Sequence, residues 1–100
     1  MKHLEYYEVN NFKLIDVEIP TCKSNEVLIK VLSVGLCGSD IQKLLRQTPA
    51  NGYLKTKILG HEIFGDVVRC GVNVKNIKLG QKVVVNPFIC SEKCGDNCPD

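Results

Sequence analysis

The sequence carries little net charge, with 13 Lys and Arg residues against 11 Asp and Glu residues and a formal excess of +2. This balance argues against a nucleic-acid or anionic-membrane partner, because both bind basic patches. No apolar run approaches the roughly 20 residues of a membrane-spanning helix. The first seven residues, MKHLEYY, lack the apolar segment of a secretory signal. We therefore expect a cytoplasmic protein.

The motif G-x-G-x-x-G, which cradles a dinucleotide pyrophosphate, is also missing. The sequence contains no internal repeat and no low-complexity stretch. A hydrophobic content of 44% and a charged content of 24% are ordinary for a globular chain and argue against intrinsic disorder. One hundred residues are enough for one small domain.

Cysteine, in contrast, is abundant, with six residues in 100. In a secreted chain this count would suggest three disulfides. Without a signal sequence, metal binding is the better interpretation. The cysteines are also unevenly spaced, since three of them crowd the C-terminal end (Cys90, Cys94 and Cys98). We interpret Cys22 and Cys70 as structural or incidental.

Most of the chain has the branched or alternating apolar pattern of β-strands. Strands are expected over residues 4–8, 12–19, 26–36, 63–72 and 82–86. Asn10 and Asn11 form the first turn, because asparagine tolerates left-handed backbone, and Pro20 ends the second strand. Gly65 lies inside a predicted strand, where glycine usually marks a bulge or a close backbone approach.

The pattern changes after residue 40. Ile41, Leu44 and Leu45 have helical spacing, which predicts one or two helical turns over residues 41–46 with Ser39 or Asp40 as the N-cap. Many short strands with so little helix predict a mostly β domain, closed into a barrel or folded as a sandwich.

Two short segments carry most of the reactive side chains: residues 35–40 (GLCGSD) and residues 60–62 (GHE). Cys37 and His61 are good zinc ligands. Asp40 is suited to accept a hydrogen bond from a ligating imidazole, and the Ser39 hydroxyl is suited to pass on a proton. Glu62 can bind a metal directly, or it can influence the site without binding the metal.

Each of these residues also has an ordinary structural interpretation. A buried cysteine such as Cys37 is most often a small hydrophobic residue. A single histidine is more often hydrogen-bonded than metal-bound, and Ser39 and Asp40 can simply cap a helix. Residue types and spacing alone leave both interpretations open.

The two segments resemble the N-terminal catalytic domain of zinc-dependent medium-chain dehydrogenases. The matching stretches are residues 35–40 (GLCGSD), 60–67 (GHEIFGDV) and 80–83 (GQKV), in that order and in the same strand context. The resemblance extends over nearly the whole chain from about residue 4. Within the family it is greatest to the polyol branch, which includes sorbitol, threonine and galactitol-phosphate dehydrogenases.

The resemblance implies a GroES-like, partly open β-barrel over residues 1–100. It implies a catalytic zinc held by Cys37 and His61, with Glu62 as a third ligand in polyol-type sites. It also implies that Ser39 begins a proton relay and that Asp40 supports His61. The implied reaction is hydride transfer from an alcohol or polyol, held by zinc as the alkoxide, to NAD or NADP.

The C-terminal cysteines resemble the structural zinc lobe of the same family. The usual pattern there is C-x2-C-x2-C-x7-C, whereas both gaps between Cys90, Cys94 and Cys98 are three residues. A fourth ligand would lie beyond Asp100, so the individual ligands of a second zinc stay open. The alternative is a set of loop cysteines without metal.

A dehydrogenase of this type also needs a Rossmann domain of roughly 150 residues, which this sequence does not contain. We therefore expect the catalytic domain of a longer, homo-oligomeric parent chain, cut within the structural zinc lobe at about residues 88–100. Such a piece would be inactive alone. The alternative is a non-catalytic GroES-like module that binds a metal or a partner.

Overall fold

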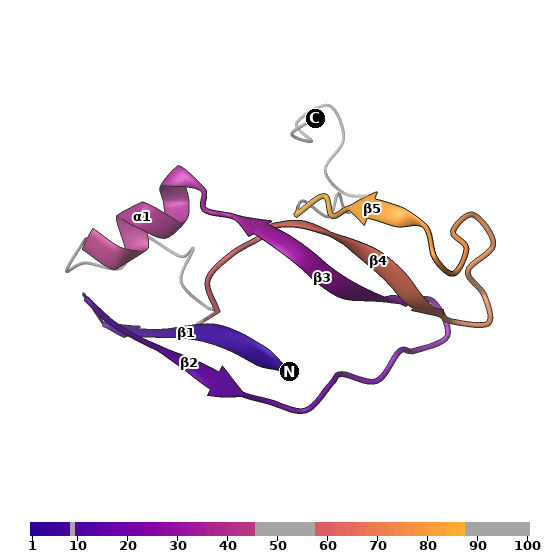
Figure 1. The fold of residues 1–100 in the computed structure, drawn as a ribbon, viewed down its shortest axis with the longest axis horizontal. Coiled ribbons are helices and arrows are strands. Elements are labelled where there is room, and N and C mark those ends of the chain that lie inside the picture. The colour runs from indigo at the N-terminus through magenta and orange to yellow at the C-terminus, as the bar shows by residue number, and fades with distance from the viewer. Residues whose placement is uncertain (9, 46–57, 88–100) are drawn as a thin grey trace, which may run out of the picture.

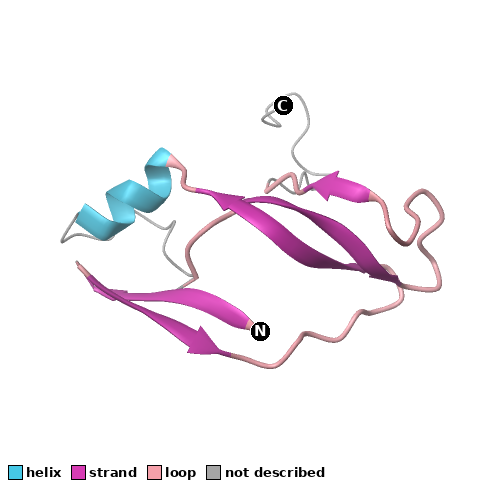
Figure 2. Ribbon diagram, in the orientation of Figure 1, coloured by secondary structure: helices cyan, strands magenta, loops and turns pink. Residues whose placement is uncertain are grey.

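The computed structural model describes residues 1–8, 10–45 and 58–87, and these residues form mainly β-strands (Figures 1 and 2). The elements are β1 (Lys2–Glu8), β2 (Asn11–Asp16), β3 (Val27–Gly35), α1 (Gly38–Leu45), β4 (Glu62–Cys70) and β5 (Lys82–Val84). The prediction of a mostly β fold is confirmed. No helix in the described ranges is long and apolar enough to cross a membrane.

The strands form two antiparallel sheets that do not close into a barrel within the described residues. One sheet has the order β1-β2 and the other has the order β3-β4-β5. Figure 1 shows α1 at one end of the molecule, directly after β3, and the chain returning between the two sheets to reach β4. Residues 46–57, which follow α1, lie outside the described residues.

The β1-β2 hairpin turns at Asn10, whose φ of 58° is the left-handed conformation expected from the sequence. The predicted extension of the second strand to residue 19 is wrong, because β2 ends at Asp16. Asp16 pairs with Lys2, and the next backbone bond runs from Val17 N–H to the Met1 carbonyl. Regular pairing between β1 and β2 ends at this point.

The predicted close approach at Gly65 is confirmed. Gly65 pairs with Val31, and the β3-β4 register shifts between Val31 and Ser33, as at a β-bulge. A Cβ at Gly65 would lie 2.4 Å from the Lys30 carbonyl oxygen and 2.6 Å from Ile29 Cγ2. The two strands therefore approach too closely for any side chain at this position.

Gly65→Ala is expected to destabilise the fold by about 2 kcal/mol or more, because the Lys30 backbone cannot move without disturbing the ladder. Gly38→Ala is the matched control, since a Cβ there meets nothing within 4 Å. Its stability should stay the same or rise slightly. Urea unfolding of both variants measures the difference, and equal midpoints would contradict the close approach.

Helix α1 begins earlier than predicted, at Gly38 rather than residue 41. Ser39 and Asp40 therefore lie inside the first turn, and their predicted role as N-cap is wrong. Cys37 precedes the helix instead, and its carbonyl accepts from the N–H groups of Asp40 (3.0 Å) and Ile41 (3.2 Å). The Asp40 carboxylate accepts in return from Cys37 N–H. This is the bond of a capping box that runs from the third helical residue back to the N-cap backbone.

Little apolar surface is buried in the described part of the chain, where Leu59 and Val67 are the buried hydrophobic residues. Large apolar side chains on the three-stranded sheet stay exposed, among them Val31, Leu32, Val34, Phe64, Val68 and Val84. So small a core cannot by itself fix the loops at the ends of the strands. Hydrogen bonds must therefore hold those loops in place.

Candidate metal centre

The antiparallel register of β3 and β4 brings the two reactive segments to one end of the sheet. Gly35, the last residue of β3, pairs with Glu62, the first residue of β4. Cys37 follows this pair by two residues and His61 precedes it by one. A thiol and an imidazole that are far apart in sequence therefore lie beside each other.

A second contact fixes the approach to His61. The Leu59 N–H donates to the Leu4 carbonyl at 3.0 Å, and Ile58 forms an isolated bridge with Glu5. These bonds anchor the returning chain to the edge of β1. Gly60 and His61 are thereby placed between the hairpin and the start of β4.

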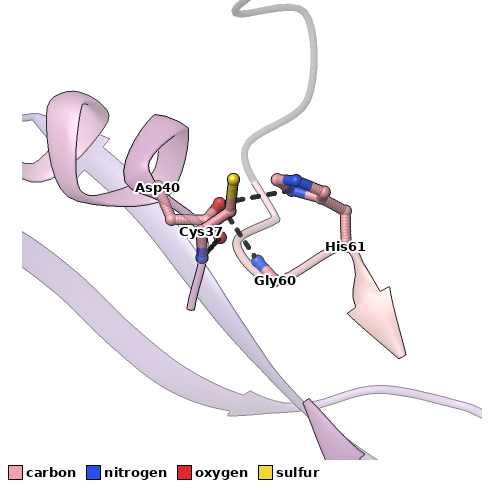
Figure 3. A network of polar contacts seen from close by, with 4 residues as sticks. All are labelled: Cys37, Asp40, Gly60 and His61. Carbon is pink, nitrogen blue, oxygen red and sulfur yellow. Dashed lines mark hydrogen bonds and ion pairs between the residues drawn. The ribbon is translucent and has the colours of Figure 1, made fainter. Parts of the chain in front are cut away.

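Asp40 ties the two segments together (Figure 3). Its side chain is fully buried, with an exposed fraction of 0%. Oδ2 accepts from Cys37 N–H at 3.2 Å, and Oδ1 accepts from Gly60 N–H at 3.4 Å. A buried carboxylate is stable only where donors replace its water, and no buried side-chain polar atom in the described part lacks a partner.

Asp40 also faces the imidazole of His61. The distance from Asp40 Oδ1 to His61 Nδ1 is 3.6 Å, just beyond hydrogen-bond range, so a small ring rotation would complete the bond. With Nδ1 turned toward Asp40, Nε2 is the ring nitrogen left for another partner (Figure 3). Asp40 and His61, for which the sequence predicted a supporting contact, therefore lie close together in the structure.

The three residues predicted to bind the catalytic metal lie together. One ligand atom from each of Cys37, His61 and Glu62 can be chosen so that all three atoms lie within 4.8 Å of one another. Cys37 and His61 are half-buried, whereas Glu62 is exposed. The cluster is therefore reachable from solvent on its Glu62 side.

The donor set fits zinc. A thiolate sulfur, an imidazole nitrogen and a carboxylate oxygen are the three ligand types that zinc takes from proteins, and three protein ligands leave a fourth position open. In a tetrahedral site with bonds of about 2.0 to 2.3 Å, ligand atoms lie roughly 3.3 to 3.8 Å apart. The spacing here, within 4.8 Å, needs a contraction of about 1.5 Å at most, which side-chain rotation can supply.

The other predicted site residues are placed as follows. Ser39 lies exposed in the first turn of α1, two residues after Cys37. Cys90, Cys94 and Cys98 fall outside the described residues. The thiols of Cys22 and Cys70 are free, and each contacts a backbone carbonyl, Glu26 O at 3.1 Å and Ile77 O at 3.6 Å.

Sequence reasoning missed the contributions of two glycines. Gly60 has a φ of 89°, and a Cβ there would lie 2.6 Å from Val34 Cγ1, so only glycine can present this N–H to Asp40. Gly35 lies directly opposite Glu62. What these two glycines face follows only from the folded structure.

Comparison with known proteins is consistent with this geometry. The family model "Alcohol dehydrogenase GroES-like domain" matches residues 23–100. The chain is similar to L-galactonate-5-dehydrogenase of Escherichia coli strain K12, with 43% identity over 77 residues, 77% of this chain and 22% of that protein.

Two solved structures are similar as well. 2R,3R-butanediol dehydrogenase from Bacillus subtilis matches with a TM-score of 0.72 and 30% identity, over 84% of this chain and 27% of that one. A Sinorhizobium meliloti 1021 structure, described as a zinc-binding dehydrogenase bound to NADP, matches with a TM-score of 0.65 and 32% identity over 81% of this chain and 23% of that one. The chain thus spans about a quarter of the length of these proteins.

Proposed function

The chain belongs to the alcohol dehydrogenase GroES-like domain family, and from this premise we propose that it forms the metal-binding part of the active site of a zinc-dependent alcohol or polyol dehydrogenase. The observation that carries the proposal is the convergence of Cys37, His61 and Glu62 within 4.8 Å. The dehydrogenases to which the chain is similar support it, since their names denote oxidation of hydroxyl groups.

In this proposal, Cys37 Sγ and His61 Nε2 hold the zinc, and the Glu62 carboxylate is the third ligand. When bound, zinc supplies a Lewis acid that lowers the pKa of an alcohol hydroxyl. Asp40 lies 3.6 Å from Nδ1, which leaves Nε2 as the ring nitrogen for the metal. Because Asp40 also holds Cys37 N–H and Gly60 N–H, both zinc ligands are oriented before the metal arrives.

Proton removal is assigned to Ser39. Its hydroxyl stands two residues from Cys37 in the exposed first turn of α1. There Oγ can accept the proton of the substrate hydroxyl and pass its own proton to water. NAD or NADP, when bound, would supply the acceptor for the hydride from the carbon that bears the hydroxyl.

The nicotinamide cofactor binds outside residues 1–100 in this proposal, because the sequence contains no G-x-G-x-x-G motif. The NADP bound in the Sinorhizobium meliloti structure supports a nicotinamide cofactor.

A second, structural zinc at Cys90, Cys94 and Cys98 is also part of the proposal and rests on the spacing of these cysteines.

Steady-state kinetics of the full-length protein that carries this chain test the function. A panel of secondary alcohols and polyols should reduce NAD⁺ or NADP⁺, as followed by absorbance. Ser39→Ala should lower kcat by about 100-fold while zinc content is unchanged. Ser33→Ala, a control on exposed β3, should not change kcat. No turnover with any alcohol would refute the proposed reaction, and full activity of Ser39→Ala would refute the relay.

A further inference from the structure

The Glu62 carboxylate occupies the space that a side chain at position 35 would need. Gly35 and Glu62 are direct partners across β3 and β4. A Cβ added to Gly35 would lie 2.7 Å from Glu62 Oε2, 3.2 Å from Glu62 Cβ and 3.7 Å from Glu62 Cδ. All three contacts are with the Glu62 side chain. The absence of a side chain at position 35 therefore leaves room for Glu62.

We propose that Gly35 is a positioning residue that decides whether Glu62 joins the Cys37 and His61 cluster. The proposal rests on the metal site proposed above. Because Gly35 has no side chain, the carboxylate can fold back over the end of β3, within 4.8 Å of the thiol and the imidazole. Any side chain at position 35 would turn the carboxylate away from them.

The tightest contact is with the carboxylate, which must give way, whereas the 3.2 Å contact with Glu62 Cβ asks the strand to shift only slightly. Oε2 is the far end of a flexible side chain, and Glu62 is exposed, so the displaced carboxylate can move into water. The glycines of the described part with positive φ are Gly60 and Gly80. Position 35 therefore accepts the backbone of alanine without strain.

Gly65 shows the opposite behaviour. A Cβ there meets the backbone of Lys30 at 2.4 Å, and that backbone cannot move aside. Substitution at Gly65 should therefore damage the fold, whereas substitution at Gly35 should spare the fold and alter the donor set. With Glu62 displaced, the cluster falls from three ligand atoms to two, and the metal loses its only carboxylate.

Metal titration of the purified chain with Cys90, Cys94 and Cys98 changed to serine tests the proposal, with Zn²⁺ competed against a chromophoric chelator and Co²⁺ as the spectroscopic probe. Gly35→Ala should weaken Zn²⁺ binding at this site by about tenfold or more. It should change the d–d bands of the Co²⁺ form and keep the thiolate charge-transfer band, because Cys37 still ligates. Gly38→Ala, whose Cβ meets nothing within 4 Å, should bind as the wild type does.

A double-mutant cycle separates an effect through Glu62 from a general structural effect. In the Glu62→Ala background, Gly35→Ala should cause no further loss of affinity. Should Gly35→Ala alone fold poorly, the double variant should fold better than Gly35→Ala, because it lacks the clashing carboxylate and keeps only the 3.2 Å contact with the Cβ at position 62. Wild-type affinity in Gly35→Ala, or an equal loss in both backgrounds, would overturn the role of Gly35 and leave the metal site standing. Absence of Zn²⁺ binding by the wild type would overturn both.

Discussion

Asp40→Ala is expected to destabilise the chain by about 2–4 kcal/mol, because two backbone N–H groups lose their acceptor in a buried setting. The carboxylate is fully buried and accepts from Cys37 N–H and Gly60 N–H, which belong to different segments. Its loss should also free the His61 ring, which lies 3.6 Å from Oδ1. Urea unfolding gives the stability change, and Zn²⁺ titration should show weaker binding at the same time.

Asp66→Ala is the matched control for this change. Asp66 is also a paired carboxylate, bonded to Lys82 Nζ at 2.7 Å, but its side chain is 30% exposed and its partner is 63% exposed. Such surface ion pairs contribute roughly 0–1 kcal/mol. Equal destabilisation by Asp40→Ala and Asp66→Ala would contradict the role of Asp40 as the tie between the two segments.

Cys37→Ser and His61→Ala are each expected to weaken zinc binding at the candidate site by more than about 100-fold, because each removes a direct ligand. In a background with Cys90, Cys94 and Cys98 changed to serine, Cys37→Ser should also remove the thiolate charge-transfer band of the Co²⁺ form. In the protein that carries this chain, both variants should lose dehydrogenase activity. Chelator competition at fixed pH measures the affinity.

The chain supplies a control of the same chemistry for each variant. Cys22→Ser replaces a free thiol that contacts backbone carbonyls, and His3→Ala replaces an imidazole paired with Glu5 on β1. Neither should change zinc binding. Similar losses in Cys22→Ser and Cys37→Ser would show that the thiol at position 37 has no special role.

Strand periodicity predicted the fold well, because branched apolar residues and turn residues act locally. The strands, the Asn10 turn and the glycine approach at Gly65 all followed from such local signals. The end of β2 and the start of α1 did not follow from such local signals. The first depends on a strand partner distant in sequence, and the second depends on a bond in the adjoining turn. β2 ends where its regular pairing with β1 ends, and α1 starts where Asp40 bonds back to Cys37.

The candidate site divides in the same way. The types and spacing of Cys37, His61 and Glu62 suggested a metal centre before any geometry was known. Their proximity depends on the Gly35–Glu62 register, which no local pattern encodes. The same is true of the N–H groups that Asp40 accepts and of the space that Gly35 leaves open.

The central claim is that Cys37, His61 and Glu62 form a zinc site, and zinc K-edge absorption spectroscopy tests it most directly. A variant with Cys90, Cys94 and Cys98 all changed to serine isolates this site from any second zinc. We predict one zinc per chain, with one sulfur at about 2.3 Å and two or three nitrogen or oxygen neighbours at about 2.0–2.1 Å. Absence of stoichiometric zinc, or a zinc environment without sulfur, would contradict the claim.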